Sequence, residues 1–202
     1  MSALQKTFLS PAQYLELERN AEFKSEYYAG EMYAMAGASE AHVLIVSNLT
    51  FEFVSQFRRR PCKTYIMDMR VRIDASGLYA YPDVVLVCGN PDFTDGRHDT
   101  LLNPQVIIEV LSPSTAAYDR GEKFLHYRLL PSLTDYLLVT QNAMRVEHYA
   151  RQPDGTWLLT DVSGPDGEIV LASVGCRLRL ADVYDKVEAD PQGFFPVVRN
   201  FD

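Results

Sequence analysis

The chain of 202 residues suits one domain, and its 47% hydrophobic residues are enough for a full core. Its net charge of −8 and pI near 5.0 argue against an extended, nonspecific nucleic-acid surface, although a local basic groove stays compatible with them. No apolar run approaches the roughly 20 residues that span a bilayer, and the N-terminus has no apolar signal-peptide core, so we expect a cytoplasmic protein outside membranes.

The first residues predict a short helix and a hairpin. Residues 10–20 begin with Ser-Pro, a hydroxyl N-cap followed by proline at the first helical position. Residues 23–35 alternate strand-forming aromatics around an Ala-Gly turn. Two acids, Glu26 and Glu31, flank this turn and are candidate site residues. Glu31 is a candidate third carboxylate for a metal, and a solvated turn position is the plain alternative for it.

A long helix is expected over about residues 40–57, because apolar residues recur there at spacings of three and four. His42 lies on its apolar side, where a histidine is more often a core residue than a catalytic one. The run Arg58-Arg59-Arg60 follows at the C-terminal end, before Pro61. These cations complement the helix dipole, and nucleic-acid contact is the sharper alternative.

The rest of the chain predicts an α+β or α/β domain over residues 1–202, with a central mixed β-sheet flanked by helices and a β-rich C-terminal part. Expected in order are a strand over 63–73, buried strands over 84–87 and 106–111, an exposed loop over 89–103, a helix over about 117–130, a strand over 133–140, a hairpin over 144–150 and 156–162, and one or two strands over 168–180.

Two carboxylates interrupt the apolar strands. Asp83 follows Pro82 at the start of the first buried strand, and Glu109 lies inside the run Val-Ile-Ile-Glu-Val-Leu. A turn or salt-bridge role for Asp83, and an edge-strand position for Glu109, are the plain alternatives. A buried carboxylate costs several kcal/mol without a partner, and two close together repel. A divalent metal between them would remove this cost.

The composition of the chain favours Mg²⁺ or Mn²⁺ over zinc. The cysteines, Cys62, Cys88 and Cys176, include no C-x-x-C pair, and the histidines show no H-x-x-x-H spacing. A zinc knuckle and a disulfide framework are therefore not expected, and carboxylate oxygens are the expected ligands.

Lys123 is the candidate cation of the site. It lies on the helix predicted after the second buried strand, four residues from Asp119 and four from Tyr127, so the three side chains share one side of the helix. An exposed Asp–Lys pair is the plain alternative. In the functional interpretation, the ammonium reaches the two carboxylates and orients the nucleophilic water or stabilises the transition state.

Several segments together resemble the Uma-type putative restriction endonuclease family of the PD-(D/E)xK nuclease superfamily, over roughly residues 10–184. The segments are Glu31-Met32-Tyr33-Ala34-Met35-Ala36-Gly37, His42, Tyr81-Pro82-Asp83-Val84-Val85, Glu109-Val110-Leu111-Ser112-Pro113-Ser114-Thr115, and Asp119 with Lys123 and Tyr127. The resemblance implies a restriction-endonuclease-like core and a metal-dependent nuclease.

Within this resemblance, Asp83 and Glu109 match the two acidic half-motifs and would be metal ligands, with the carbonyl of Val110 as a third. The superfamily lysine stands two residues after the acid, where this chain has Leu111. Lys123 is then the substitute, and His42, Asp119 and Tyr127 would support the site.

Three functions are compatible with these residues. The first is a Mg²⁺-dependent DNA endonuclease, expected as a homodimer whose basic cleft would draw on Arg58 to Arg60, Arg70 and Arg72. The second is a catalytically inactive nuclease fold that binds nucleic acid or acts in regulation. The third is a different metal-assisted hydrolase with a small phosphorylated substrate, which suits the negative net charge better.

Overall fold

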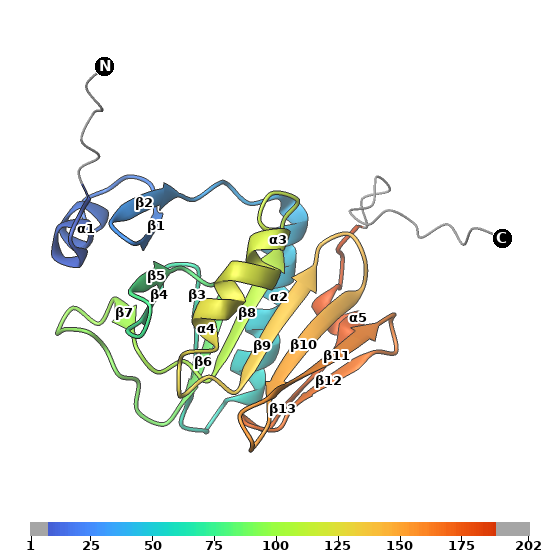
Figure 1. The fold of residues 1–202 in the computed structure, drawn as a ribbon. Helices are drawn as coiled ribbons and strands as arrows, with labels where there is room; N and C mark the ends of the chain where they lie inside the picture. Colours follow the sequence, from blue (N-terminus) through green and yellow to red (C-terminus); the bar gives the residue numbers. More distant parts are fainter. Residues whose placement is uncertain (1–7, 189–202) are drawn as a thin grey trace.

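The computed structural model describes residues 8–188, which form a six-stranded, a five-stranded and a two-stranded β-sheet together with helices that pack against them (Figure 1). The helices are α1 (Pro11–Glu18), α2 (Glu40–Gln56), α3 (Ala116–Tyr118), the π-helical turn η1 (Asp119–Lys123), α4 (Phe124–Tyr127) and α5 (Leu180–Val183). The strands are β1 (Ser25–Tyr28), β2 (Glu31–Ala34), β3 (Cys62–Ile66), β4 (Arg70–Ile73), β5 (Leu78–Ala80), β6 (Val84–Cys88), β7 (Thr100–Leu101), β8 (Val106–Leu111), β9 (Asp135–Thr140), β10 (Arg145–Arg151), β11 (Trp157–Ser163), β12 (Glu168–Leu171) and β13 (Cys176–Arg179).

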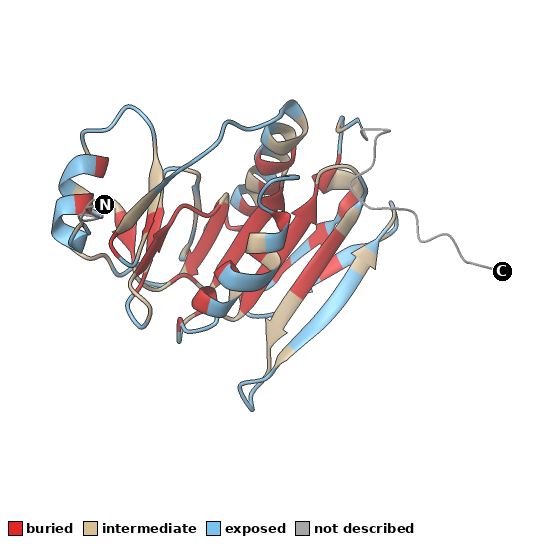
Figure 2. Cartoon of the chain, turned by 45° about the horizontal axis from the view of Figure 1, so that its top comes forward, coloured by how far each residue is buried: buried red, intermediate tan, exposed pale blue. Residues whose placement is uncertain are grey.

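The central sheet has six strands in the order β11-β10-β9-β8-β6-β3, and only the β8–β9 pair is parallel. Strands β8 and β9 are buried along their whole length, and β6 is buried except at its last residue (Figure 2). Helix α2 packs with Val84, Ile108 and Val110 on one face, and the segment from α3 to α4 packs with Ile107 and Leu111 on the other. The expected α+β class with a central mixed sheet is therefore confirmed.

A second sheet of five strands, β2-β1-β5-β4-β7, lies beside the first, with α1 next to its β1 strand (Figure 1). Strand β5 leads directly through Tyr81-Pro82 into Asp83 and β6, so this link joins the two sheets. The sequence predicted the hairpin of β1 and β2 but not the sheet that this hairpin joins, because the strands are only two to four residues long and a local pattern does not give their partners.

The expected single strand over residues 63–73 is wrong. Strand β3 ends at Ile66, and the next residue, Met67, has a positive φ of 38°. Strands β3 and β4 therefore belong to different sheets. The pattern across residues 63–73 therefore arises from two strands in succession, and Arg70, an arginine of the expected basic cleft, is only 3% exposed.

The helix expected over about residues 117–130 spans 116–127 and contains the π-turn η1. The loop expected to be exposed over residues 89–103 carries β7, in which Thr100 and Leu101 are fully buried. A short strand within a polar loop gives no recognisable pattern, because two residues cannot show alternation.

The expectation of no disulfide is also wrong for one pair. Cys62 and Cys88 are bonded across the antiparallel strands β3 and β6, where they are direct register partners. Their separation of 26 residues hides a pairing that only the strand register brings about. Cys176 is free and buried. Within residues 8–188, none of the helices combines the length and the apolar character needed to cross a bilayer.

Candidate active site

The pairing of β6 with β8 brings the two strand carboxylates together. Val84 is the register partner of Ile108, and Asp83 and Glu109 are the residues next to this pair at the same end of the two strands. Side chains two residues apart on a strand share a face, so Glu109 points to the same face as Ile107 and Leu111. This face is the one that α3, η1 and α4 cover, since Val85, Ile107 and Leu111 pack beneath these helices.

Asp83 is held by two donors from different elements. Its Oδ2 atom accepts a hydrogen bond of 2.7 Å from the backbone N–H of Val110, and its Oδ1 atom lies 3.0 Å from Nε2 of His42. His42 is in the first turn of α2, and its N–H bonds to the N-cap hydroxyl of Ser39 at 3.1 Å. The predicted supporting residue His42 thus lies against the predicted ligand Asp83.

Lys123 lies in the centre of the carboxylates. Its ammonium is 2.9 Å from Oε1 of Glu109, 3.0 Å from Oε1 of Glu26 and 3.7 Å from Oδ1 of Asp119. The same Glu109 oxygen accepts a hydrogen bond of 2.8 Å from the Tyr127 hydroxyl. Glu109, Asp119, Lys123 and Tyr127 are all buried. An exposed Asp–Lys helix pair is therefore excluded.

Burial and mutual repulsion control the ionisation of this cluster. Burial raises the pKa of Glu109 well above its usual range, Lys123 opposes this rise, and the nearby Asp119 and Asp83 add to it. The pKa of Asp119 is raised for the same first reason. For Lys123, burial alone would lower the pKa, but the attraction of Glu109, Glu26 and Asp119 outweighs it and raises the pKa well above 10.5.

Glu26, one of the two hairpin acids, contacts the cluster through Lys123. Besides Lys123, its Oε1 atom accepts a hydrogen bond of 3.3 Å from the N–H of Tyr81. Glu31 lies at the turn end of β2, as the register partner of Tyr28. The sequence singled out Glu31 as the candidate third carboxylate, whereas it is Glu26 whose carboxylate lies 3.0 Å from the Lys123 ammonium.

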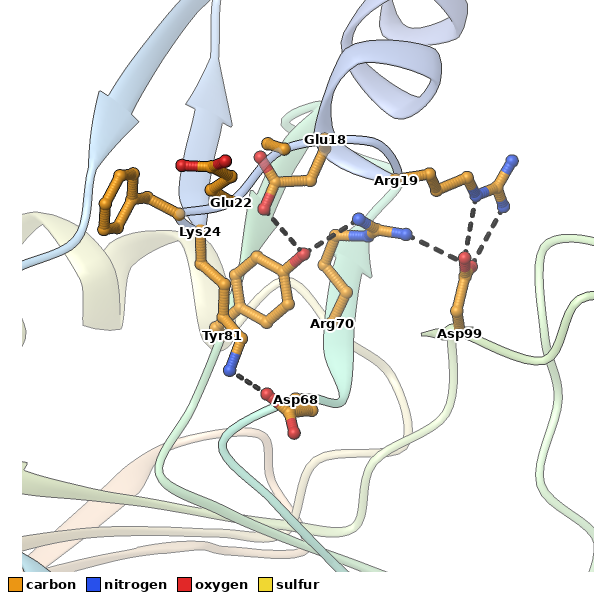
Figure 3. Close-up of a pocket in the computed structure, with 10 residues that line it drawn as sticks. Glu18, Arg19, Glu22, Lys24, Asp68, Arg70, Tyr81 and Asp99 are labelled. Atoms are coloured by element: carbon orange, nitrogen blue, oxygen red, sulfur yellow. Dashed lines mark hydrogen bonds and ion pairs between the residues drawn. The ribbon is translucent and has the colours of Figure 1, made fainter.

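The Tyr81 hydroxyl belongs to a polar network, formed with residues of α1 and the five-stranded sheet, that the sequence did not predict. The Tyr81 hydroxyl donates to Oε1 of Glu18 at 2.9 Å and accepts from Arg70 at 2.8 Å, and Arg70 continues to Asp99 at 3.1 Å (Figure 3). Arg19 closes the network on Asp99 at 2.7 Å. Because Tyr81 is two residues from Asp83 and bonds to Glu26, this network links α1 to the carboxylate cluster.

The arginine run is distant from this cluster. At 1.5 Å per residue, the last residue of α2, Gln56, lies roughly 21 Å from His42 along the helix axis, and the arginine run follows that end. The guanidinium of Arg60 donates to the carbonyls of Gly175 at 3.1 Å and Val174 at 2.5 Å, so it ties the β12–β13 turn to the end of the helix. For Arg60 this is a structural role, and nucleic-acid contact by Arg58 and Arg59 stays a prediction.

The carboxylate oxygens of this cluster suit a hard divalent cation that takes only a few of its ligands from the protein. In residues 8–188, no group of three His, Cys, Asp or Glu side chains is arranged to hold a metal ion. Mg²⁺, however, commonly uses one or two carboxylates and keeps several waters. Here Glu26, Glu109 and Asp119 contact one ammonium, and Asp83 is close enough to Glu109 to raise its pKa, so the carboxylates outnumber the cation.

Comparison with known proteins matches this chain to one protein family and to two relatives of similar length. The sequence profile of the family described as "Uma2: Putative restriction endonuclease" matches residues 11–181. The uncharacterized protein sll1609 of Synechocystis sp. is 41% identical over 161 residues, covering 80% of this chain and 91% of its own length. The uncharacterized protein slr1290 of the same organism is 35% identical over 176 residues, covering 87% of this chain and 91% of its own length.

Among solved structures, the chain is similar to a putative nuclease belonging to DUF820 from Anabaena variabilis. The TM-score is 0.71 with 18% identity, and the match covers 86% of this chain and 96% of the other. At this identity the likeness shows the fold, a restriction-endonuclease-like arrangement of sheet and helices.

Proposed function

Because the chain belongs to the Uma2 family of putative restriction endonucleases, we propose that it is a metal-dependent endonuclease that hydrolyses phosphodiester bonds in DNA. The observation that carries the proposal is the position of Lys123, whose ammonium lies 2.9 Å from Glu109 although it comes from a helix rather than from the strand. In this proposal Asp83, Glu109 and Lys123 are the catalytic residues, and Mg²⁺ or Mn²⁺ is the cofactor.

Asp83, Glu109 and the Val110 carbonyl would hold the metal, with Glu31 or Glu26 as a further acid. When bound, the cation would polarise the scissile phosphate and lower the pKa of the attacking water. The negative charge that collects on Asp83, Glu109 and Asp119 supports this proposal, because it opposes the ionisation of Glu109 and a bound cation would relieve it.

The other side chains position these groups. His42 and the Val110 N–H fix the two oxygens of Asp83, and Tyr127 fixes Oε1 of Glu109. Lys123 stays protonated at neutral pH because three carboxylates raise its pKa. A permanent positive charge beside the cluster is suited to stabilise the charge that develops on a phosphoryl oxygen.

The test is cleavage of supercoiled plasmid DNA by the purified chain with Mg²⁺ or Mn²⁺. We expect Asp83→Asn and Glu109→Gln to abolish cleavage, while Asp166→Asn, at an exposed position, leaves it unchanged. Circular dichroism of each variant checks that the fold is retained. Cleavage that persists in a folded Asp83 or Glu109 variant would contradict the metal-site assignment.

The same preparation separates the alternatives. If no metal supports cleavage but calorimetry shows DNA binding, the chain is an inactive nuclease fold that acts as a binding module. If DNA is neither cut nor bound, release of phosphate from small phosphorylated compounds with Mn²⁺ tests the third reading, a hydrolase of small substrates.

A further inference from the structure

Strand β11 forms one free edge of the central sheet. It pairs with β10 along all seven of its residues, and no strand within residues 8–188 pairs with its other side. Nearly the whole strand is exposed, as the long pale blue strand at the border of the sheet in Figure 2 shows. Leu158 is 56% exposed and Leu159 is 49% exposed. Such an edge is a ready template for another strand.

Two hydrogen bonds reveal which backbone groups this edge offers. Gln152 donates its N–H to the carbonyl of Thr156, and Gly164 donates its N–H to the carbonyl of Met144. Each bond lies one step beyond an end of the β10–β11 register, and hydrogen-bonded pairs alternate along an antiparallel ladder. The even-numbered residues of β11 therefore bond to β10. The N–H and C=O groups of Trp157, Leu159, Asp161 and Ser163 point outward.

The usual protections of a free edge are missing from β11. The strand contains no proline and no lysine, and its only charged residue is Asp161. This charge is paired within the sheet, because Arg145 on β10 lies 2.5 Å from Asp161. Two copies of the edge could therefore approach without an uncompensated charge in either strand.

We propose that β11 is the dimer interface, on which a second copy of this chain pairs its own β11 antiparallel about a two-fold axis at Thr160. Only one position of the two-fold axis lets every outward N–H and C=O group of β11 form a hydrogen bond with the second copy. With Thr160 opposite itself, Trp157 pairs with Ser163 and Leu159 with Asp161, each in both directions. This self-complementary arrangement is the one that a two-fold interface requires.

The side chains agree with this register. Successive residues of a strand point to opposite faces, so Leu158 and Val162 share a face, and Val162 already packs against the core beneath α2. In the dimer Leu158 of one copy lies opposite Val162 of the other, which covers the exposed leucine with an apolar partner. The two central sheets then form one continuous sheet.

Charge at the two-fold position gives a decisive test. Thr160 is exposed, so Thr160→Lys and Thr160→Glu should leave the monomer folded, yet each places like charges directly opposite in the dimer. Sedimentation of the full chain should give a dimer for the wild type, a monomer for each variant alone, and a dimer again when the two variants are mixed. Val170→Lys, at an exposed strand position outside the edge, is the control and should stay dimeric.

A wild type that sediments as a monomer at all concentrations would overturn the proposal. A Thr160→Lys variant that remains as dimeric as the wild type would overturn it as well, since the dimer would then use another surface. Circular dichroism spectra that match the wild type exclude unfolding as the cause of any change.

Discussion

Replacement of Lys123 by methionine should destabilise the fold strongly at neutral pH, independently of any activity. The ammonium is only 7% exposed and lies within 4 Å of Glu109, Glu26 and Asp119. Methionine fills a similar volume but leaves these buried carboxylates without their cation. Removing one partner of a buried ion pair typically costs about 3–5 kcal/mol, and we expect the Lys123→Met variant to lose this amount of its free energy of unfolding.

The loss should depend on pH with a definite sign. The folded-state pKa of Lys123 lies above the ordinary 10.5, so its stabilising contribution is fully present at pH 7 and disappears only in strong alkali. In the variant the pKa of Glu109 rises further, because Lys123 no longer lowers it. A raised carboxyl pKa makes stability fall as pH rises, by about 1.4 kcal/mol per pH unit for each proton released. The deficit should therefore shrink as the pH is lowered towards 5.

Urea unfolding followed by circular dichroism at pH 5, 6, 7 and 8 measures this effect. Lys186→Met is a matched control, because Lys186 is 83% exposed and its contact with Asp185 is a surface pair worth about 0–1 kcal/mol at most. If Lys123→Met and Lys186→Met unfold at the same urea concentration at every pH, the ammonium does not hold the carboxylates together, and the electrostatic reasoning is wrong.

Three further outcomes are expected. Tyr127→Phe removes the hydrogen bond to buried Glu109 and should lower the free energy of unfolding by about 1.5–3 kcal/mol in urea titrations. Arg60→Ala should lower the melting temperature, because Arg60 binds the carbonyls of Val174 and Gly175, whereas Arg58→Ala should leave it unchanged; equal effects would contradict this structural role. Glu26→Gln should slow plasmid cleavage about tenfold or more, equivalent to about 1.4 kcal/mol, because the Glu26 carboxylate lies 3.0 Å from the Lys123 ammonium. Cleavage at the wild-type rate would contradict this role of Glu26.

The two carboxylates Asp83 and Glu109 could be predicted as site residues because each is a charged residue next to or within an apolar, buried strand. Glu109 lies in an otherwise apolar strand of six residues, and Asp83 directly precedes another buried strand. A costly residue type in such a position requires compensation, and this argument needs no knowledge of the tertiary fold. The long helix α2 could also be predicted from the sequence, because its apolar residues recur at helical spacing over 17 residues.

The contacts between distant segments could not be predicted in the same way. The hydrogen bond from Tyr81 to Glu18 joins residues 63 positions apart, and the ion pair between Lys123 and Glu26 joins β1 to η1. Local patterns give neither the order of strands in a sheet nor the side from which a helix covers it. The same limit explains the Cys62–Cys88 bond, which follows from the register of β3 and β6 alone.

The position of Leu111 shows how a lysine on the helix comes close to Glu109 although the strand has no lysine two residues after it. Side chains two residues apart on a strand share a face, so Leu111 points to the same side of β8 as Glu109. Leu111 is 3% exposed and packs in the core beneath α3, η1 and α4. These helical turns cover that same face, and Lys123 extends from them to within 2.9 Å of Glu109. The ammonium thus reaches Glu109 from the helical segment that covers the sheet, and the strand position two residues after Glu109 holds an apolar side chain of the core.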